Sequence, residues 1–332
     1  MIESIRRGDY GFFGPDSPSW KVWASPTALI GFQRAVVLEH FDPFLAAAVA
    51  DSAGIYTDPS GRLDRTLAYF LTVAVSDGRT AIEVSDALMR IHARAKGVEP
   101  ITGSRYSAND PDAQLWIHVT GWHSVLKCYE QYGAGPLSPA EESRFWAESR
   151  IAAELQTCKP ADVPASRDEV RQYFTDVRGR LCTSEHADRA MHYLLRTPRN
   201  RGVRLWAGSR LLAPAAIATL PKWMRHMGNF NQPAAVDVAV TPVARAWVKA
   251  LSANNFRPML AVARQIAPET AEVLAQHLSA GPPARRTTTT PAEARERLAI
   301  HASQPAATSP SHAEIADSAT VDSFDRSAPS RA

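Results

Sequence analysis

Two histidines in apolar surroundings are the first residues in this chain whose types and spacing point to chemistry. His118 lies within an apolar series that recurs every three or four residues from Leu115 to Tyr129, as on one face of a helix. His92 follows Leu88 and Ile91 at the end of the preceding apolar segment. A histidine placed in this way is either a core residue with one hydrogen bond or a ligand for a metal.

A polar stripe precedes both histidines. Its members recur at helical spacing and are Arg62, Arg65, Thr66 and Tyr69. The other side of the same segment is apolar, so burying two guanidinium groups there requires anionic partners. One interpretation is a solvated face with salt bridges to Asp58 or Asp64, and the other is a clamp for carboxylates or a set of donors for bound dioxygen.

Three consecutive apolar helices would thus direct polar groups to one buried place, and we interpret this place as a haem site. A neutral imidazole is the commonest axial ligand of haem iron, and helical walls exclude water from it. The three cysteines include no Cys-x-x-Cys-His sequence, so the haem would be held without covalent attachment. A core in which each histidine merely has one hydrogen bond remains the alternative.

Other chemistries lack their minimal parts. The chain has no Gly-x-Ser-x-Gly elbow, phosphate-binding loop or dinucleotide fingerprint, and it offers no convincing pair of Glu-x-x-His elements for a di-iron bundle. A net charge of +3 spread along the chain argues against nucleic-acid binding. No apolar run is long enough for an integral membrane segment, and the first residues do not resemble a secretory signal, so we expect a cytoplasmic protein.

The predicted fold class is all-α, a single large multi-helix domain for which a globin-like core is one suitable arrangement. Breakers in residues 11–25 predict a loop there. Expected helices follow at 26–53 with a kink at Pro43, then at 59–76, 79–96, 111–132, 139–155, 167–177, 184–196, 203–212, 215–229, 238–252, 256–266 and 268–279. From Gly281 the sequence is rich in Thr, Ser, Pro and Ala, which predicts a catalytic domain at 1–280 and a disordered C-terminal tail at 281–332.

From about Gly14 to Asn229 the chain resembles the MpaB and rubber-oxygenase (latex-clearing protein) family of haem-binding, all-helical oxygenases. The matching pieces are Gly14-Pro15-Asp16-Ser17 with Trp20, Gly61-Arg62-Leu63-x-Arg65-Thr66, the His92 segment ending in Gly97, Trp116-Ile117-His118, Leu137-Ser138 with Glu148, Val163-Pro164-Ala165-Ser166, and Leu220-Pro221 with Arg225. Their order and spacing together carry the resemblance.

The resemblance implies a b-type haem whose iron is bound by His92, with Arg62 and Thr66 in polar positions of the haem site. Arg65 replaces a lysine that some relatives carry near the iron, and a guanidinium does not readily serve as a neutral ligand. Many relatives read His-Pro where this chain reads Asp42-Pro43, with His40 two positions earlier.

The sequence therefore predicts a haem b oxygenase that uses dioxygen to oxidise or cleave a small apolar, isoprenoid- or lipid-like substrate. His92 is the expected iron ligand and Arg62 and His118 the expected haem-binding residues, with His118 as a supporting or alternative ligand. Arg65 and Thr66 are the expected catalytic polar donors. A haem sensor or carrier without turnover and a cofactor-free helical lipid-binding or interaction protein are the two alternatives.

Overall fold

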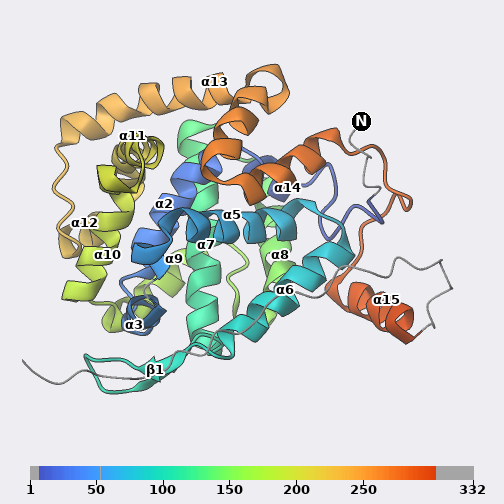
Figure 1. Ribbon diagram of the computed structural model, residues 1–332, viewed down its shortest axis with the longest axis horizontal. Coiled ribbons are helices and arrows are strands. Elements are labelled where there is room, and N and C mark those ends of the chain that lie inside the picture. Colours follow the sequence, from blue (N-terminus) through green and yellow to red (C-terminus); the bar gives the residue numbers. More distant parts are fainter. Residues whose placement is uncertain (1–6, 53, 304–332) are drawn as a thin grey trace, which may run out of the picture.

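Helices arranged around one central helix make up the architecture of this chain, in a computed structural model that describes residues 7–52 and 54–303 (Figure 1). The helices are α1 (Pro18–Trp23), α2 (Thr27–Glu39), α3 (Pro43–Ser52), α4 (Gly54–Thr57), α5 (Pro59–Val75), α6 (Gly78–His92), α7 (Pro111–Tyr132), α8 (Pro139–Ala153), α9 (Arg167–Asp176), α10 (Glu185–Leu195), α11 (Val203–Thr219), α12 (Lys222–Met227), α13 (Ala234–Ile266), α14 (Pro268–Ser279) and α15 (Pro291–Ser303). Short 3-10 turns lie at Pro160–Asp162, Val177–Arg180 and Arg199–Arg201, and one antiparallel hairpin joins β1 (Lys96–Val98) to β2 (Arg105–Ser107). The predicted all-α class is confirmed.

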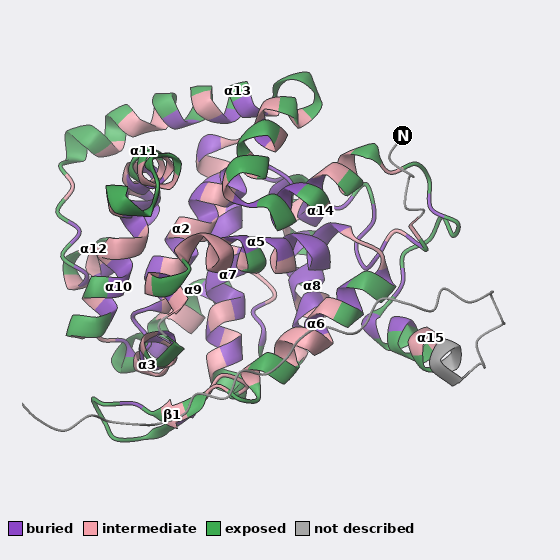
Figure 2. Cartoon of the chain, viewed as in Figure 1, coloured by how far each residue is buried: buried purple, intermediate pink, exposed green. Residues whose placement is uncertain are grey.

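Helix α7 is the central element, and Figure 2 shows buried residues along most of its length. It begins at the predicted position because Asp110 accepts hydrogen bonds from the backbone N–H groups of Asp112 and Ala113, and Pro111 occupies the first helical position. Residues of α7 belong to both large hydrophobic clusters, one around Trp122 and the other around Trp116. The helix therefore joins the two halves of the core.

The close crossing of α2 over α7 depends on Gly31. A β-carbon at this position would lie 2.8 Å from the Cα atom of Val125, a contact that neither backbone could accommodate without moving. The crossing brings the C-terminal end of α2 alongside the start of α7, where the indole of Trp116 donates to the carbonyl oxygen of Glu39 at 3.2 Å. Glu39 and His40 are thereby fixed beside the other candidate site residues.

Helix starts were predicted well because their capping residues are local in the sequence. Asp58 caps α5, Asp77 caps α6, and Ser138 forms a full capping box with Glu141 at the start of α8. The predicted break between residues 252 and 256 is also present, since Asn254, Asn255 and Phe256 have left-handed backbone angles within α13. The ends of these helices are thus set by caps and turns that can be recognised in the sequence.

Several predictions of local structure were wrong. The expected break between residues 212 and 215 is absent, because α11 continues through Pro214 to Thr219, and α12 is a separate helix from Lys222 to Met227. Residues 18–23 form α1, because Ser17 caps a helix that begins with Pro18 despite the surrounding breakers. Helix α6 ends at His92, before the expected residue 96, and the predicted loop after it contains the β1–β2 hairpin. Strands this short carry too few residues for an alternating pattern to be recognised.

The predicted boundary at residue 280 also needs correction, because residues 281–303 continue the packed structure. The backbone N–H groups of Ala284 and Arg285 donate to the carbonyl oxygens of Arg7 and Gly8, and that of Thr289 donates to Gly11. Ala294 is buried within the main hydrophobic cluster. These contacts are mostly polar and made by the backbone, so the pattern of apolar residues in the sequence did not predict them.

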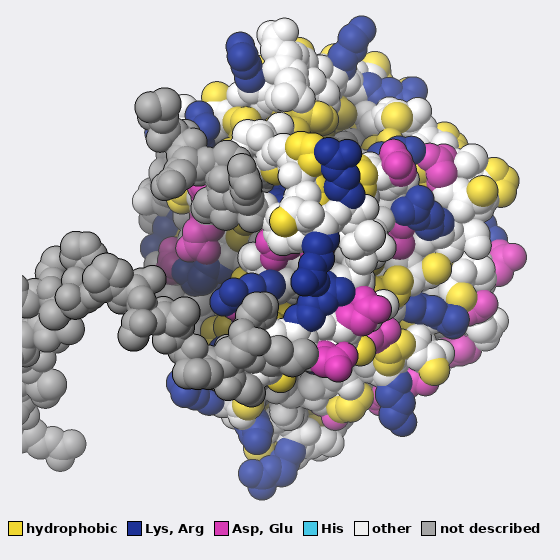
Figure 3. All heavy atoms as spheres, turned by 90° about the vertical axis from the view of Figure 1, so that its right-hand side faces the viewer, with side chains coloured by type: hydrophobic (Ala, Val, Ile, Leu, Met, Phe, Trp, Pro, Cys, Tyr) yellow, Lys and Arg dark blue, Asp and Glu magenta, His cyan; other side chains and the backbone are white. Residues whose placement is uncertain are grey.

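Ion pairs add to the attachment of α15. Arg297 lies 3.1 Å from Asp9, and Arg295 lies 2.7 Å from Asp86 on α6. Figure 3 shows the side of the molecule where α14 and α15 lie, with basic and acidic side chains interspersed. The remainder of the predicted tail, residues 304–332, lies outside the described residues.

In the part of the chain that the structure describes, no helix combines the length and apolar character needed to cross a bilayer.

Removing residues 282–332 should destabilise the protein, contrary to what a disordered tail from residue 281 would predict. A chain ending at Ser303 keeps every contact described above and serves as the reference. We expect the shorter chain to melt at least about 4 °C lower, because it loses buried Thr289 and Ala294 and the partners of Asp9. Equal melting temperatures by circular dichroism would show that these contacts contribute nothing.

Candidate functional site

Arg62 lies at the centre of the polar groups that the structure brings together. Its half-buried guanidinium donates to the hydroxyl of Ser52 at 3.0 Å, and within residues 7–52 and 54–303 it forms no ion pair with a carboxylate. Burial lowers the pKa of Arg62, and the charge of Glu39 opposes this effect. A guanidinium in this position is available for an anion such as a carboxylate.

The charge of Arg62 affects the pKa of three titratable side chains on two other helices. They are Glu39 and His40 at the end of α2 and His92 at the end of α6. The charge of Arg62 therefore reaches the ends of α2 and α6. The sequence predicted that the segments carrying Arg62, His92 and His118 would converge, whereas His118 contacts Ser149 of α8 and the residues of α2 were not expected.

His92 has the properties of a neutral imidazole with one ring nitrogen engaged. Burial, followed by the nearby charge of Arg62, lowers the pKa of His92, so the ring is uncharged at neutral pH. Its Nδ1 atom lies 3.3 Å from the carboxamide nitrogen of Gln114 on α7. In this contact the carboxamide N–H donates to Nδ1, so the neutral ring carries its proton on Nε2, and binding of iron through Nε2 would require that proton to leave Nε2.

Glu39 was not singled out in the sequence, yet its carboxyl group is the most unusual acid in this group. Desolvation raises the pKa of Glu39 to about 7, although Arg62 opposes the shift. A carboxyl group with this pKa can hold or release a proton near neutral pH. Only the three-dimensional approach of α2 to α5 reveals it, because in sequence Glu39 is one acid at a helix end.

His40 is a further imidazole with an unpartnered nitrogen. Its Nδ1 atom lies 2.6 Å from the carbonyl oxygen of Val36, which can only accept, so the proton is on Nδ1 and the lone pair on Nε2. Nε2 is buried and has no hydrogen-bond partner among the described residues. Buried polar atoms are rarely left unpaired, so Nε2 of His40 is a candidate contact for a bound group.

Thr66 and Arg65 take different environments although they are adjacent. The half-buried hydroxyl of Thr66 donates to the carbonyl oxygen of Arg62 at 2.8 Å, which places Thr66 on the Arg62 side of α5. Arg65 is 59% exposed and lies 3.2 Å from Asp58, the residue that caps the helix. One residue step turns a helix by about 100°, so Arg65 is directed away from Thr66. Arg65 still lies near enough for its charge to lower the pKa of Arg62, but its own guanidinium pairs with Asp58 at the surface, which matches the solvated-face interpretation.

His118 is fully buried one helical turn after Gln114. Its Nε2 atom lies 2.9 Å from the carbonyl oxygen of Ser149 on α8, so Nε2 donates, and Nδ1 has no partner among the described residues. Burial lowers the pKa of His118 to about 4. His118 therefore joins α7 to α8 as a neutral residue, an arrangement consistent with a supporting role.

Residues 20–253 match the family model described as "ER-bound oxygenase mpaB/B'/Rubber oxygenase, catalytic domain". No curated protein and no solved structure matches the chain. The matched range contains all the predicted site residues and ends before the C-terminal segment that packs against residues 7–11.

Acid should destabilise the protein partly through His118. A buried histidine with a lowered pKa gives stability that is fully present above the unfolded value near 6.5 and is lost as the pH falls toward about 4. Between pH 7 and pH 5 this loss is about 2 kcal/mol. Glu39, whose pKa is raised, works in the opposite direction, so the test compares variants and not absolute slopes.

We expect His118→Gln to lose about 2 kcal/mol less unfolding free energy than the wild type over this pH range, measured by urea denaturation. The matched control is His186→Gln, because His186 is exposed on α10. Identical pH slopes for His118→Gln and the wild type would mean that His118 is not held neutral by burial.

Proposed function

The chain belongs to the MpaB and rubber oxygenase family, whose shared unit is an oxygenase catalytic domain, and on this premise we propose that it is a haem-dependent oxygenase. The proposed cofactor is haem b, and the proposed reaction is oxidation or oxidative cleavage of a small apolar, isoprenoid- or lipid-like substrate by dioxygen. The proposed location is the cytoplasm. The observation that carries the proposal is that Arg62, in the first turns of α5, acts through its charge on Glu39 and His40 at the end of α2 and on His92 at the end of α6.

The residues present are suited to haem in their donor chemistry. His92 is the proposed iron ligand, since it is neutral at pH 7 and its pKa is affected by the charge of Arg62, the proposed propionate anchor. Arg62 is the proposed anchor for a haem propionate, because it has no carboxylate partner among the described residues. His118 supports α7 from the α8 side and is a candidate ligand only if His92 is not.

Haem iron, when bound, supplies the activation of dioxygen. The contribution of the chain is to bind, to orient and to control protons. Thr66 offers a hydroxyl beside Arg62, and the carboxyl of Glu39 can take or give a proton near neutral pH. Arg65 was predicted as a second polar donor, but the proposal now assigns that role to Arg62 and Thr66, since Arg65 pairs with Asp58 at the surface.

The first test is an absorption spectrum of protein produced with adequate haem. We expect a Soret band in the wild type and none in folded His92→Ala, because an iron–imidazole bond is the main directional tether of a noncovalent haem. The control is His186→Ala, which alters an exposed imidazole on α10 and should leave the band unchanged. Recovery of the band by added imidazole in His92→Ala would identify the defect as a missing ligand.

An unshifted Soret band with full haem content in His92→Ala would place the ligand elsewhere, and His40 and His118 would be the next residues to change. Colourless wild-type protein would favour the cofactor-free lipid-binding alternative. Bound haem that consumes no oxygen with any alkene would favour a sensor or carrier.

A second test uses two arginines from the same helix. Arg62→Gln should weaken haem binding about tenfold, because it removes a charge-assisted hydrogen bond to a propionate. Arg65→Gln is the matched control and should bind haem as the wild type does, since its partner is Asp58. Titration of the apoprotein with haemin measures both affinities. Equal losses in the two variants would argue for a general charge effect and against a specific anchor.

A further inference from the structure

The β1–β2 hairpin stands at the edge of the helical bundle, at the end of α6 that carries His92 (Figure 1). Its cross-strand pairs are Lys96 with Ser107, Gly97 with Tyr106, and Val98 with Arg105. Because side chains alternate along a strand and pairs share a face, Lys96, Val98 and Arg105 lie on one face of the hairpin. The opposite face is anchored, since Tyr106 is buried and donates its hydroxyl to Asp51 of α3.

The outer face and its surroundings expose large aliphatic side chains. Val98 is 57% exposed, Ile101 in the hairpin loop is 52% exposed, and Ile91 in the last turn of α6 is 64% exposed. Single exposed aliphatic residues are normal on a protein surface. Three of them on one projecting segment are better explained by a surface that contacts another apolar surface.

The same segment is strongly basic. Its exposed cationic side chains are Arg90, Arg94, Lys96 and Arg105. No ion pair joins any of them to a carboxylate in the part of the chain that the structure describes.

Three of the acidic residues nearby are already engaged. Glu99 is buried and accepts hydrogen bonds from the backbone of Ile101 and Thr102. Asp51 accepts from Tyr106, and Asp110 caps α7. The hairpin therefore presents aliphatic groups between unpaired positive charges.

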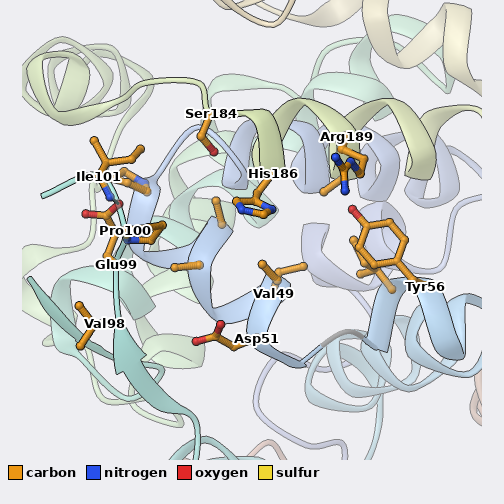
Figure 4. Close-up of a pocket in the computed structure, with 16 residues that line it drawn as sticks. Val49, Asp51, Tyr56, Val98, Glu99, Pro100, Ile101, Ser184, His186 and Arg189 are labelled. Atoms are coloured by element: carbon orange, nitrogen blue, oxygen red, sulfur yellow. Dashed lines mark hydrogen bonds between the residues drawn. The ribbon is translucent and has the colours of Figure 1, made fainter. Parts of the chain in front are cut away.

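A cavity of about 370 Å³ lies behind the hairpin, between α3, α4, α10 and residues 98–101 (Figure 4). Small side chains leave this space open, notably Ala46, Ala47 and Ala50 of α3 and Ala190 of α10. It contains none of the predicted site residues, but Asp51 at its wall is next to Ser52, whose hydroxyl accepts from Arg62. Its volume is that of a small-ligand site, and the exposed loop of the hairpin forms part of its rim.

We propose that this segment docks the protein on an anionic lipid bilayer. The docking face consists of Ile91, Arg94, Lys96, Val98, Ile101 and Arg105. The aliphatic side chains enter the boundary between headgroups and acyl chains, while the basic side chains contact lipid phosphates. Docking in this orientation sets the rim of the cavity at the lipid surface.

Charge complementarity selects a bilayer over other occupants. A second copy of this chain would bring like charges together, which disfavours self-association through this face. A nucleic acid would satisfy the basic groups but would leave Val98 and Ile101 in water. The inference does not depend on the proposed haem chemistry, because lipid binding needs neither His92 nor a cofactor.

The experiment is sedimentation of the purified protein with vesicles of phosphatidylcholine, alone or with added phosphatidylserine. We expect binding to the anionic vesicles, weakened by salt, and little binding to the neutral ones. Lys96→Glu with Arg105→Glu should lower the partition coefficient at least about tenfold. Val98→Ser with Ile101→Ser should lower it as well, because less apolar surface is inserted.

The matched control lies on α13, away from the hairpin, where Val238 is 75% exposed and Arg245 is exposed. Val238→Ser with Arg245→Glu makes the same kinds of change and should bind vesicles as the wild type does. Circular dichroism and melting temperature establish that each variant is folded, and Lys96→Ala with Arg105→Ala replaces the charge reversal if it is not.

Equal binding to neutral and anionic vesicles would overturn the proposal, as would wild-type binding by both hairpin variants. So would loss of binding in the α13 control alone, or a dimer that the hairpin changes dissociate. The Soret band of each sample is recorded separately. Failure of lipid binding with the band present, or lipid binding without the band, therefore separates this inference from the proposed function.

Discussion

The approach of α2 to α7 at Gly31 is the constraint on which the candidate site depends. With a β-carbon 2.8 Å from the Cα atom of Val125, any other residue would push the two helices apart. Separation would move Glu39 and His40 away from Arg62 and would release the Trp116 indole from the end of α2. A single missing side chain in the core therefore positions polar groups about two helical turns away.

The same crossing buries a guanidinium that has no counter-ion among the described residues. Arg34 of α2 is almost completely buried, and it donates to the hydroxyl of Ser124 at 2.7 Å and to the carbonyl oxygen of Thr219 at 3.3 Å. Desolvation lowers the pKa of Arg34 to about 10, so the group remains charged at neutral pH. Hydrogen bonds to neutral oxygens offset part of the cost of burying this charge and join α2, α7 and α11.

Much of the fold could be predicted from the sequence because its signals are local. Asp58, Asp110 and Ser138 mark helix starts within a few residues of where the helices begin, and the chain is long enough for each helix to show its apolar face. The hairpin escaped prediction because its strands are only three residues long. The packing of residues 284–298 escaped because backbone groups and ion pairs hold it, and these have no sequence period.

The candidate site was predictable only where residues share one element. Arg62 and Thr66 are on one side of α5 as their spacing indicated, and His92 is at the end of α6 beside them in space. Spacing on one helix could not decide which arginine is more buried; in the structure Arg62 is half-buried and Arg65 is exposed beside Asp58. Glu39 and Gln114 gain their significance from tertiary contact alone, so no local pattern could have marked them.

The pairing of residues 7–11 with residues 284–289 has a consequence for how the protein is made. Backbone hydrogen bonds join Tyr10 to Thr287 and Gly11 to Thr289. Almost the whole described chain therefore forms one long loop whose two ends are held together by these bonds. Residues 7–11 leave the ribosome first and remain without these partners until residues 284–289 have been synthesised. The entropy of closing so large a loop is lost only when the intervening helices have already packed. During synthesis residues 20–253, which match the family model, must therefore fold while residues 7–11 still lack their hydrogen-bond partners. The pairing of residues 7–11 with residues 284–289 forms last.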